Sequence, residues 1–145
     1  MNEFEQYGIR FEYPEGWEVD SGQTEDGRTV TVNSPETSFW SVSLFDGRPS
    51  IESVLDAALS AYEEEYDEVD IYTPDADDAP VSICGSEETV ARDVEFVCLE
   101  LVNTVCLRAI TADAFTLLVL YQGTDFELAS TRSTLEKITQ SLSLA

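Results

Sequence analysis

The sequence predicts an α+β fold, with a single, largely antiparallel β-sheet and helices packed on its faces. Several short segments alternate apolar and polar residues with the period of a strand, while the segment after Pro49 has helical spacing. The run from Phe115 to Tyr121 is apolar on both faces apart from Thr116. A strand of this kind lies in the middle of a sheet and is covered on both sides. Nothing indicates a second domain, so residues 1–145 are expected to fold as one.

The N-terminal part predicts a β-meander. Tyr7, Ile9, Phe11 and Tyr13 alternate with polar residues and predict the first strand. A turn at 14–16 follows, and an extended segment is expected to begin at Trp17 and to run into a polar hairpin loop over 20–27. Two further strands are expected over 28–33 and 38–45.

A helix is predicted from Ile51 to about Asp67. Ser50 can cap its first turn, and Glu52 suits the positive end of the helix dipole. A short strand over 69–72 and an exposed loop over 74–80 are expected next.

The second half predicts strands over 81–84, 89–101, 104–111 and 115–121. Asn103 and residues 112–114 are expected to form turns. Thr124 and Glu127 have the spacing of a capping box, which predicts the start of a C-terminal helix. This helix could be interrupted near Ser130.

The chain is strongly acidic, with 30 acidic and 7 basic side chains and a net charge of -23. Such a charge excludes nucleic acid and anionic membrane as partners, because both are bound through Lys and Arg. It fits either adaptation to high internal salt or steering of a basic protein partner.

The N-terminal residues contain neither a basic segment nor an apolar one, and no run of about 18 apolar residues occurs. These features predict a cytoplasmic protein without membrane insertion, although removal of an export signal or lipoprotein anchor would leave a similar start.

Three cysteines and no histidine restrict the chemistry. Free thiols are expected, and Cys98 and Cys106, on neighbouring predicted strands, are the pair that could bridge outside a reducing compartment. Without histidine, a Cys/His zinc site and an imidazole-activated thiol are excluded.

Two acidic clusters suggest cation sites or solvated surface, and the first also suggests a site for a basic partner; we expect no metal. The first surrounds the end of the predicted helix and lacks the loop spacing of a calcium site. It comprises Glu63, Glu64, Glu65, Asp67, Glu68 and Asp70. The second, Asp75, Asp77 and Asp78, is closer to calcium spacing but lacks the glycine and final glutamate of an EF-hand loop.

Arginines on predicted strands could hold a carboxylate ligand or pair with neighbouring acids. They are Arg10, Arg92 and Arg108.

Aromatic side chains beside polar segments form the candidate binding groove, and core packing is the alternative. The groove residues are Tyr13, Trp17, Phe39, Trp40 and Tyr72. No catalytic or cofactor motif is present, so we expect no catalytic residues and no cofactor.

The segment Tyr13-Pro14-Glu15-Gly16-Trp17 and the ending Ile138-Thr139-Gln140-Ser141-Leu142 resemble the PsbP/Mog-like family. This resemblance implies an α/β/α sandwich and a role in binding other proteins. Branches of the family include Ran-binding proteins, photosystem II subunits, envelope lipoproteins and chaperones of secreted effectors.

Together these features predict a non-enzymatic protein-binding module, either an accessory subunit or chaperone-like, acting as a monomer or weak dimer. The alternatives are a small-ligand carrier that uses the aromatic groove and a domain that responds to cations.

Overall fold

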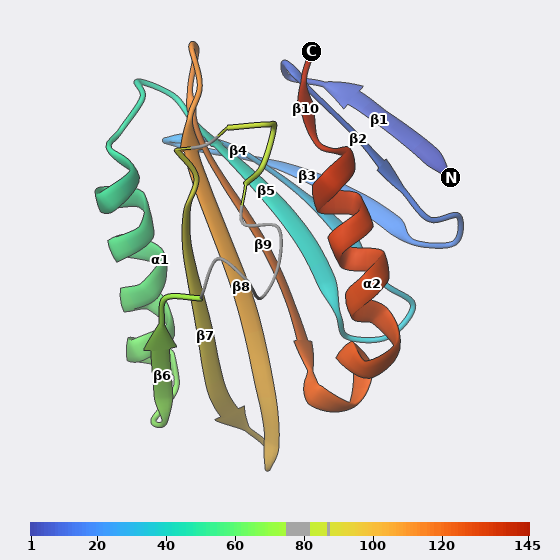
Figure 1. Ribbon diagram of the computed structural model, residues 1–145, viewed down its shortest axis with the longest axis vertical. Helices are drawn as coiled ribbons and strands as arrows, with labels where there is room; N and C mark the ends of the chain where they lie inside the picture. Colours follow the sequence, from blue (N-terminus) through green and yellow to red (C-terminus); the bar gives the residue numbers. More distant parts are fainter. Residues whose placement is uncertain (75–81, 87) are drawn as a thin grey trace.

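The computed structural model describes residues 1–74, 82–86 and 88–145, which form an α+β fold (Figure 1). Ten strands and two helices are present in these residues, and most strand pairs are consecutive and antiparallel. In chain order the elements are β1 (Asn2–Gln6), β2 (Ile9–Tyr13), β3 (Glu18–Thr24), β4 (Gly27–Asn33), β5 (Phe39–Phe45), α1 (Ile51–Glu65), β6 (Val69–Tyr72), β7 (Val90–Cys98), β8 (Leu101–Thr111), β9 (Thr116–Thr124), α2 (Asp125–Ser141) and β10 (Ser143–Leu144).

The main sheet has seven strands in the order β3-β4-β5-β9-β8-β7-β6, so β9 is the middle strand as predicted. Its successive side chains enter two separate cores. Leu117 and Val119 pack with α2, whereas Leu118 and Leu120 pack with α1. Alternate residues of a strand point to opposite faces, so the two helices cover opposite faces of the sheet.

A second sheet, β1-β2-β10, corrects the prediction of a single sheet. Tyr7 and Gly8 both have positive φ (59° and 85°) and form the turn between β1 and β2, so Tyr7 is not part of the first strand. β1 was not predicted because only Phe4 among its residues is partly buried, which leaves little alternation to detect. Ile9 and Phe11 of β2 are fully buried in the core under α2.

The predicted elements over 28–33, 38–45 and 69–72 are confirmed by β4, β5 and β6. β3 follows Trp17 but continues to Thr24, so the predicted loop over 20–27 is wrong and only Glu25 and Asp26 form the turn. α1 begins after Ser50, whose side-chain oxygen accepts a hydrogen bond from the N–H of Ser53 at 3.1 Å. The helix ends two residues before Asp67.

Three predictions for the second half are wrong. Residues 82–84 are not a strand; Val81 lies outside the described residues. The turn between β7 and β8 is at Leu99 and Glu100, while Asn103 is inside β8. α2 is continuous through Ser130, and the hydroxyl of Ser130 donates a hydrogen bond to the carbonyl of Glu127 one turn earlier.

Candidate functional site

Trp40, the central residue of the predicted groove, is a core residue. Its side chain is 0% exposed and packs on Phe11, with ring centroids 4.7 Å apart. The indole N–H donates to Thr139 Oγ1 at 3.0 Å, which satisfies the buried donor. Trp40 therefore joins β5 to β2 and α2 and presents no surface to a ligand.

The structure does not bring the five predicted groove residues together. Tyr13 and Trp17 are partly buried against the core that contains Trp40. Phe39 precedes Trp40 on β5, so its side chain points to the opposite face of the sheet. Tyr72 lies on β6, the far edge strand, where its hydroxyl bonds Glu95 at 3.0 Å. Strand alternation and strand order, which the aromatic composition does not reveal, separate them.

The predicted arginines are held by protein groups. Arg10 pairs with Glu3 at 3.5 Å on the surface, and Arg92 donates to the carbonyl of Ala91. Arg108 Nη1 bonds Asp93 Oδ1 at 2.9 Å, with side chains that are 9% and 15% exposed. Arg108 thus forms a buried ion pair between β8 and β7.

The acidic cluster at the end of α1 stays at the surface. In the part of the chain that the structure describes, no group of three acidic or cysteine side chains converges as a metal site. Asp75, Asp77 and Asp78 lie outside the described residues.

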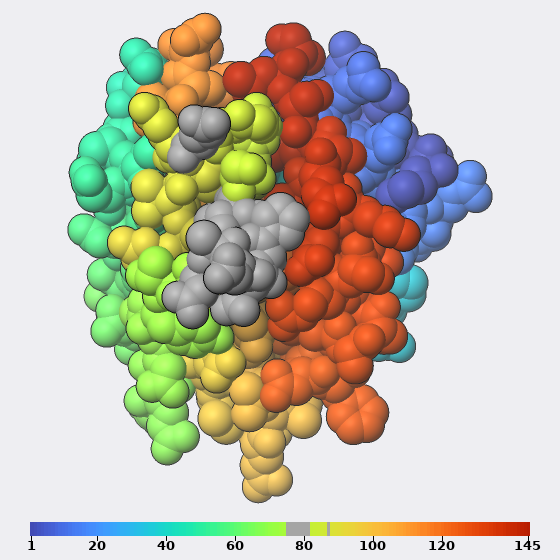
Figure 2. All heavy atoms as spheres, in the orientation of Figure 1, coloured from blue at the N-terminus to red at the C-terminus, as the bar shows by residue number. Residues whose placement is uncertain are grey.

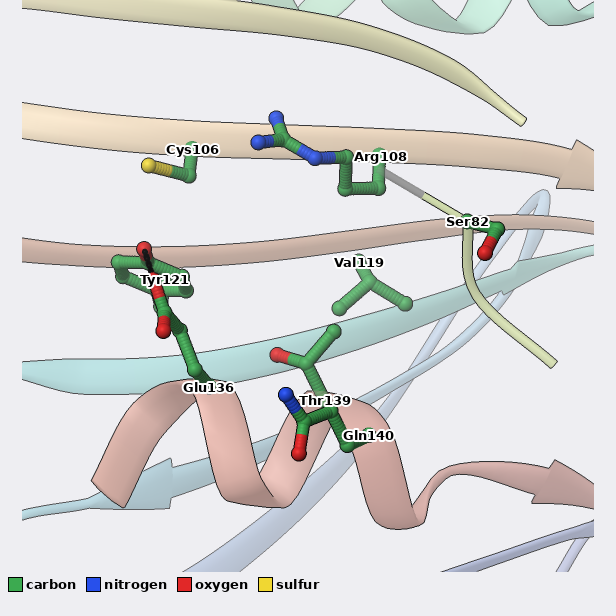
Figure 3. Close-up of a pocket in the computed structure, with 8 residues that line it drawn as sticks. All are labelled: Ser82, Cys106, Arg108, Val119, Tyr121, Glu136, Thr139 and Gln140. Carbon is green, nitrogen blue, oxygen red and sulfur yellow. Dashed lines mark hydrogen bonds between the residues drawn. The ribbon is translucent and has the colours of Figure 1, made fainter. Parts of the chain in front are cut away.

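A small pocket of about 30 Å³ lies between α2 and the main sheet. Figure 3 shows Cys106 and Arg108 from β8 and Tyr121 from β9, facing Glu136 and Thr139 of α2. Val119, Gln140 and Ser82 complete the lining. A space of this size accommodates water molecules or a very small solute.

Two polar residues of this pocket, Tyr121 and Glu136, are hydrogen-bonded to each other. The hydroxyl of Tyr121 donates to Glu136 at 3.3 Å and receives a longer contact, 3.5 Å, from Arg132. Burial raises the pKa of the Tyr121 hydroxyl and that of the neighbouring Cys106 thiol. Both groups therefore stay protonated at neutral pH, which makes Cys106 a poor nucleophile.

All three cysteines are free, and Cys98 and Cys106, the pair that could have bridged, are not joined. Cys98 packs in the core under α1, whereas Cys106 belongs to the core under α2. On β7, Cys98 also lies five residues beyond Asp93, the partner of Cys106. Opposite faces and this distance along the strands exclude a bridge.

Exposed apolar side chains gather at one end of the main sheet, which we call the apolar end. The turn between β7 and β8 projects beyond the rest of the molecule, at the bottom of Figures 1 and 2. The first residues of β8 pair with the last residues of β9, which lead directly into α2. The apolar end comprises Val97 (42% exposed), Leu99 (90%), Leu101 (50%), Val102 (38%) and Phe126 (88%).

The apolar end was not predicted, although the sequence carries a signal for it. The apolar pattern of β7 continues through Leu99 into Leu101 and Val102, where a hairpin turn is usually polar. Acidic residues surround it: Glu100 and Asp125 adjoin Leu99 and Phe126 in sequence. A surface hollow beside Val97 is lined by Glu65, Asp67 and Glu68.

Within residues 1–74, 82–86 and 88–145, neither helix combines the length and hydropathy that a membrane span requires.

Comparison with known proteins supports the fold alone. No family model matches the sequence, and no curated protein matches it either. A crystal structure of LpqN, described as involved in cell envelope biogenesis of Mycobacterium tuberculosis, is similar with a TM-score of 0.54 and 12% identity. The similarity covers 94% of this chain and 83% of that chain. None of these comparisons bears on the PsbP/Mog-like resemblance, which stays a prediction. The similarity to LpqN supports an α+β architecture.

Proposed function

We propose that the protein is a non-enzymatic protein-binding module that contacts its partner through the apolar end. The observation that carries this proposal is the exposure of Leu99 (90%) and Phe126 (88%) at the same end of the sheet. Half of the large apolar side chains that are exposed in the described residues gather there. Clustered exposed apolar groups, unlike scattered ones, favour an interaction site.

The backbone of the turn supports this proposal. Leu99 and Glu100 both have positive φ, 51° and 66°, a conformation that favours Asn-Gly in a two-residue hairpin turn. A side chain other than glycine or asparagine costs about 1 kcal/mol in this conformation. An exposed leucine that strains its own turn contributes nothing visible to stability, so a binding role accounts for it better.

The acidic residues around the apolar end favour a basic partner. Glu65, Asp67 and Glu68 beside Val97 would repel an acidic surface and attract a basic one. We therefore infer a partner with an apolar pocket that is surrounded by Lys or Arg. This inference agrees with the explanation of the net charge as steering of a basic protein partner.

The test is capture of the tagged protein's partner from its native lysate at the host's own salt concentration. A Leu99→Asn, Phe126→Ser double variant removes both anchors, and asparagine tolerates the turn conformation. We expect this variant to lose at least about 90% of the captured partner. Leu144→Ser, which removes a 47% exposed side chain on β10, is the matched control and retains it. If both variants captured equal amounts of the partner, the apolar end would not be the binding site.

A second candidate is a carrier that would use the pocket between α2 and the sheet rather than an aromatic groove, and the pocket's volume of about 30 Å³ limits its ligand to a very small solute. Several polar groups converge there beside Val119. Thr139 lines this pocket and also bonds Trp40, so ligand entry would change tryptophan fluorescence. A screen of very small solutes that changes neither this fluorescence nor the melting temperature would exclude the carrier.

We also propose a cytoplasmic location, which the three free thiols support because a reducing compartment preserves them. Cell fractionation tests this proposal, and recovery with the envelope would contradict it.

A further inference from the structure

The edge strand β3 has the features of a site for another strand. It is the terminal strand of the main sheet, and in the described part of the chain no strand pairs with its outer side. Every residue of Glu18–Thr24 except Val19 is exposed. Pairing with β4 is one-to-one along all seven residues, without a bulge. Natural edges usually carry a bulge, a proline or charged side chains that prevent further pairing. β3 has no bulge and no proline, and its two charged side chains, Glu18 and Asp20, are acidic, so they discourage pairing with an acidic strand and not with a basic one.

The register identifies the backbone groups that are free. Glu25 and Asp26 form a two-residue turn that joins Thr24 to Gly27. Such a turn makes Thr24 and Gly27 a hydrogen-bonded pair, and hydrogen-bonded pairs alternate along antiparallel strands. Val19, Ser21 and Gln23 therefore direct their N–H and C=O groups outward. These groups can bond a further strand.

The side chains of β3 differ in chemistry between its two faces. Glu18 and Asp20 pair with Asn33 and Thr31 and lie on the polar face. Asp20 also accepts a hydrogen bond from Asn33 Nδ2 at 3.1 Å. Val19 pairs with Val32, a fully buried residue, so it lies on the face that leads into the core under α2. Trp17, just before β3, packs against the same core.

We propose that β3 binds an extended segment of a partner protein in which basic and apolar residues alternate. This segment adds an eighth strand to the main sheet and bonds the outward groups of Val19, Ser21 and Gln23. Its basic side chains lie beside Glu18 and Asp20, and its apolar side chains lie beside Val19 and Trp17. This interaction is independent of the apolar end, so a failure of either proposal leaves the other standing.

The experiment titrates the protein with a seven-residue peptide of alternating lysine and valine and follows tryptophan fluorescence. We expect saturable binding together with slowed hydrogen exchange of the amides of Val19, Ser21 and Gln23. A peptide with glutamate in place of lysine should not bind. No saturable binding, or slowed exchange elsewhere in the sheet alone, would overturn the proposal.

Variants separate strand addition from simple charge attraction. Ser21→Pro removes one outward N–H at a position where an edge strand tolerates proline, and it should weaken peptide binding about tenfold relative to Ser21→Ala. If Ser21→Pro does not fold, a peptide N-methylated on alternate residues removes the same hydrogen bonds and should bind equally weakly. Glu18→Arg should reduce affinity severalfold, whereas Asp113→Arg, with the same charge change at another exposed site, should not. Equal losses in these two variants would show that net charge alone attracts the peptide and would overturn strand addition.

Discussion

The carboxylate of Glu127 accepts two hydrogen bonds from Ser38, one from its backbone N–H and one from its hydroxyl, both at 3.0 Å. Thr37 donates to the same carboxylate through its N–H at 3.0 Å and through its hydroxyl. The first turn of α2 is therefore attached to the loop that precedes β5. One carboxylate satisfies two backbone donors of that loop.

Replacement of Glu127 by Gln should lower stability by about 1–2 kcal/mol at neutral pH, because an ionised acceptor forms stronger hydrogen bonds than an amide does. Chemical denaturation measures the loss. Glu36→Gln, an exposed change of equal charge, is the control and should have little effect. An equal loss in both variants would assign the effect to net charge.

The same carboxylate should make stability depend on acid pH. Burial opposes ionisation of Glu127, but the bonds from Thr37 and Ser38 outweigh it and lower its pKa from the ordinary value of 4.5. A lowered folded-state pKa stabilises the protein above the unfolded-state pKa, and this contribution is lost as pH falls through the folded-state value. Melting temperatures from pH 7 downward should fall less steeply below about pH 4.5 in Glu127→Gln than in the wild type. Parallel curves would contradict this assignment.

Gly123 on β9 allows α2 and the loop before β5 to approach β9 closely. A Cβ at this position would lie 2.7 Å from Ser38 Oγ and 2.9 Å from Leu128 Cδ2. Gly123→Ala should therefore destabilise the fold by about 1–3 kcal/mol, the usual cost of overpacking. Gly22→Ala on β3, where nothing lies within 4 Å of the new Cβ, is the matched control for denaturation. If Gly123→Ala left the stability unchanged, α2 would be able to shift outward without cost.

The ion pair of Asp93 and Arg108 should show strong coupling between its two partners. Each single change, Asp93→Val or Arg108→Met, leaves one charge buried and should cost about 3 kcal/mol or more. The double variant removes both charges, so it should be more stable than the sum of the single losses predicts. A double-mutant cycle by denaturation measures this coupling, and strict additivity would show that the pair is well solvated.

High salt should stabilise the protein. Its net charge of -23 opposes compaction, and the last turn of α1 contains acidic residues but no basic one. Glu64→Lys should raise stability by about 0.5 kcal/mol at low salt, and this gain should vanish when salt screens the charges. Melting temperatures over a range of KCl concentrations test both statements. A melting temperature independent of salt would leave partner steering as the better explanation of the acidity.

The elements with strong periodicity could be predicted from the sequence. α1, β4, β5 and the central β9 each bury one or both faces, so burial leaves a pattern in the residues. β1 buries almost nothing, and β10 has two residues, so neither leaves a pattern that could reveal the second sheet. Thr124 does accept from the N–H of Glu127, as its spacing predicts, but the Glu127 side chain bonds a distant loop instead of completing the capping box.

The candidate site was harder to predict because it depends on tertiary arrangement. Phe39 and Trp40 are neighbours in sequence and separate in space, since a strand directs them to opposite faces. The sequence predicts Leu99 inside a strand over 89–101, and only the observed turn shows that its side chain is exposed to solvent. The contact of Glu127 with Thr37 and Ser38 and the unpaired edge of β3 both depend on strand order. Local sequence patterns do not encode strand order.

The pairing of β2 with the C-terminal residues has a consequence for how the chain folds. Ser141 Oγ accepts a hydrogen bond from the N–H of Glu12, 129 positions earlier, and Ala145 donates to the carbonyl of Gly8. Contacts between such distant segments form slowly, because a large loop must close before they contribute. Until then Ile9 and Phe11 of β2 are missing from the core under α2, and the apolar side chains that they would cover can associate with those of other molecules. Mutual repulsion among highly charged chains opposes that association, so the acidity also protects the protein during the interval before its two ends meet.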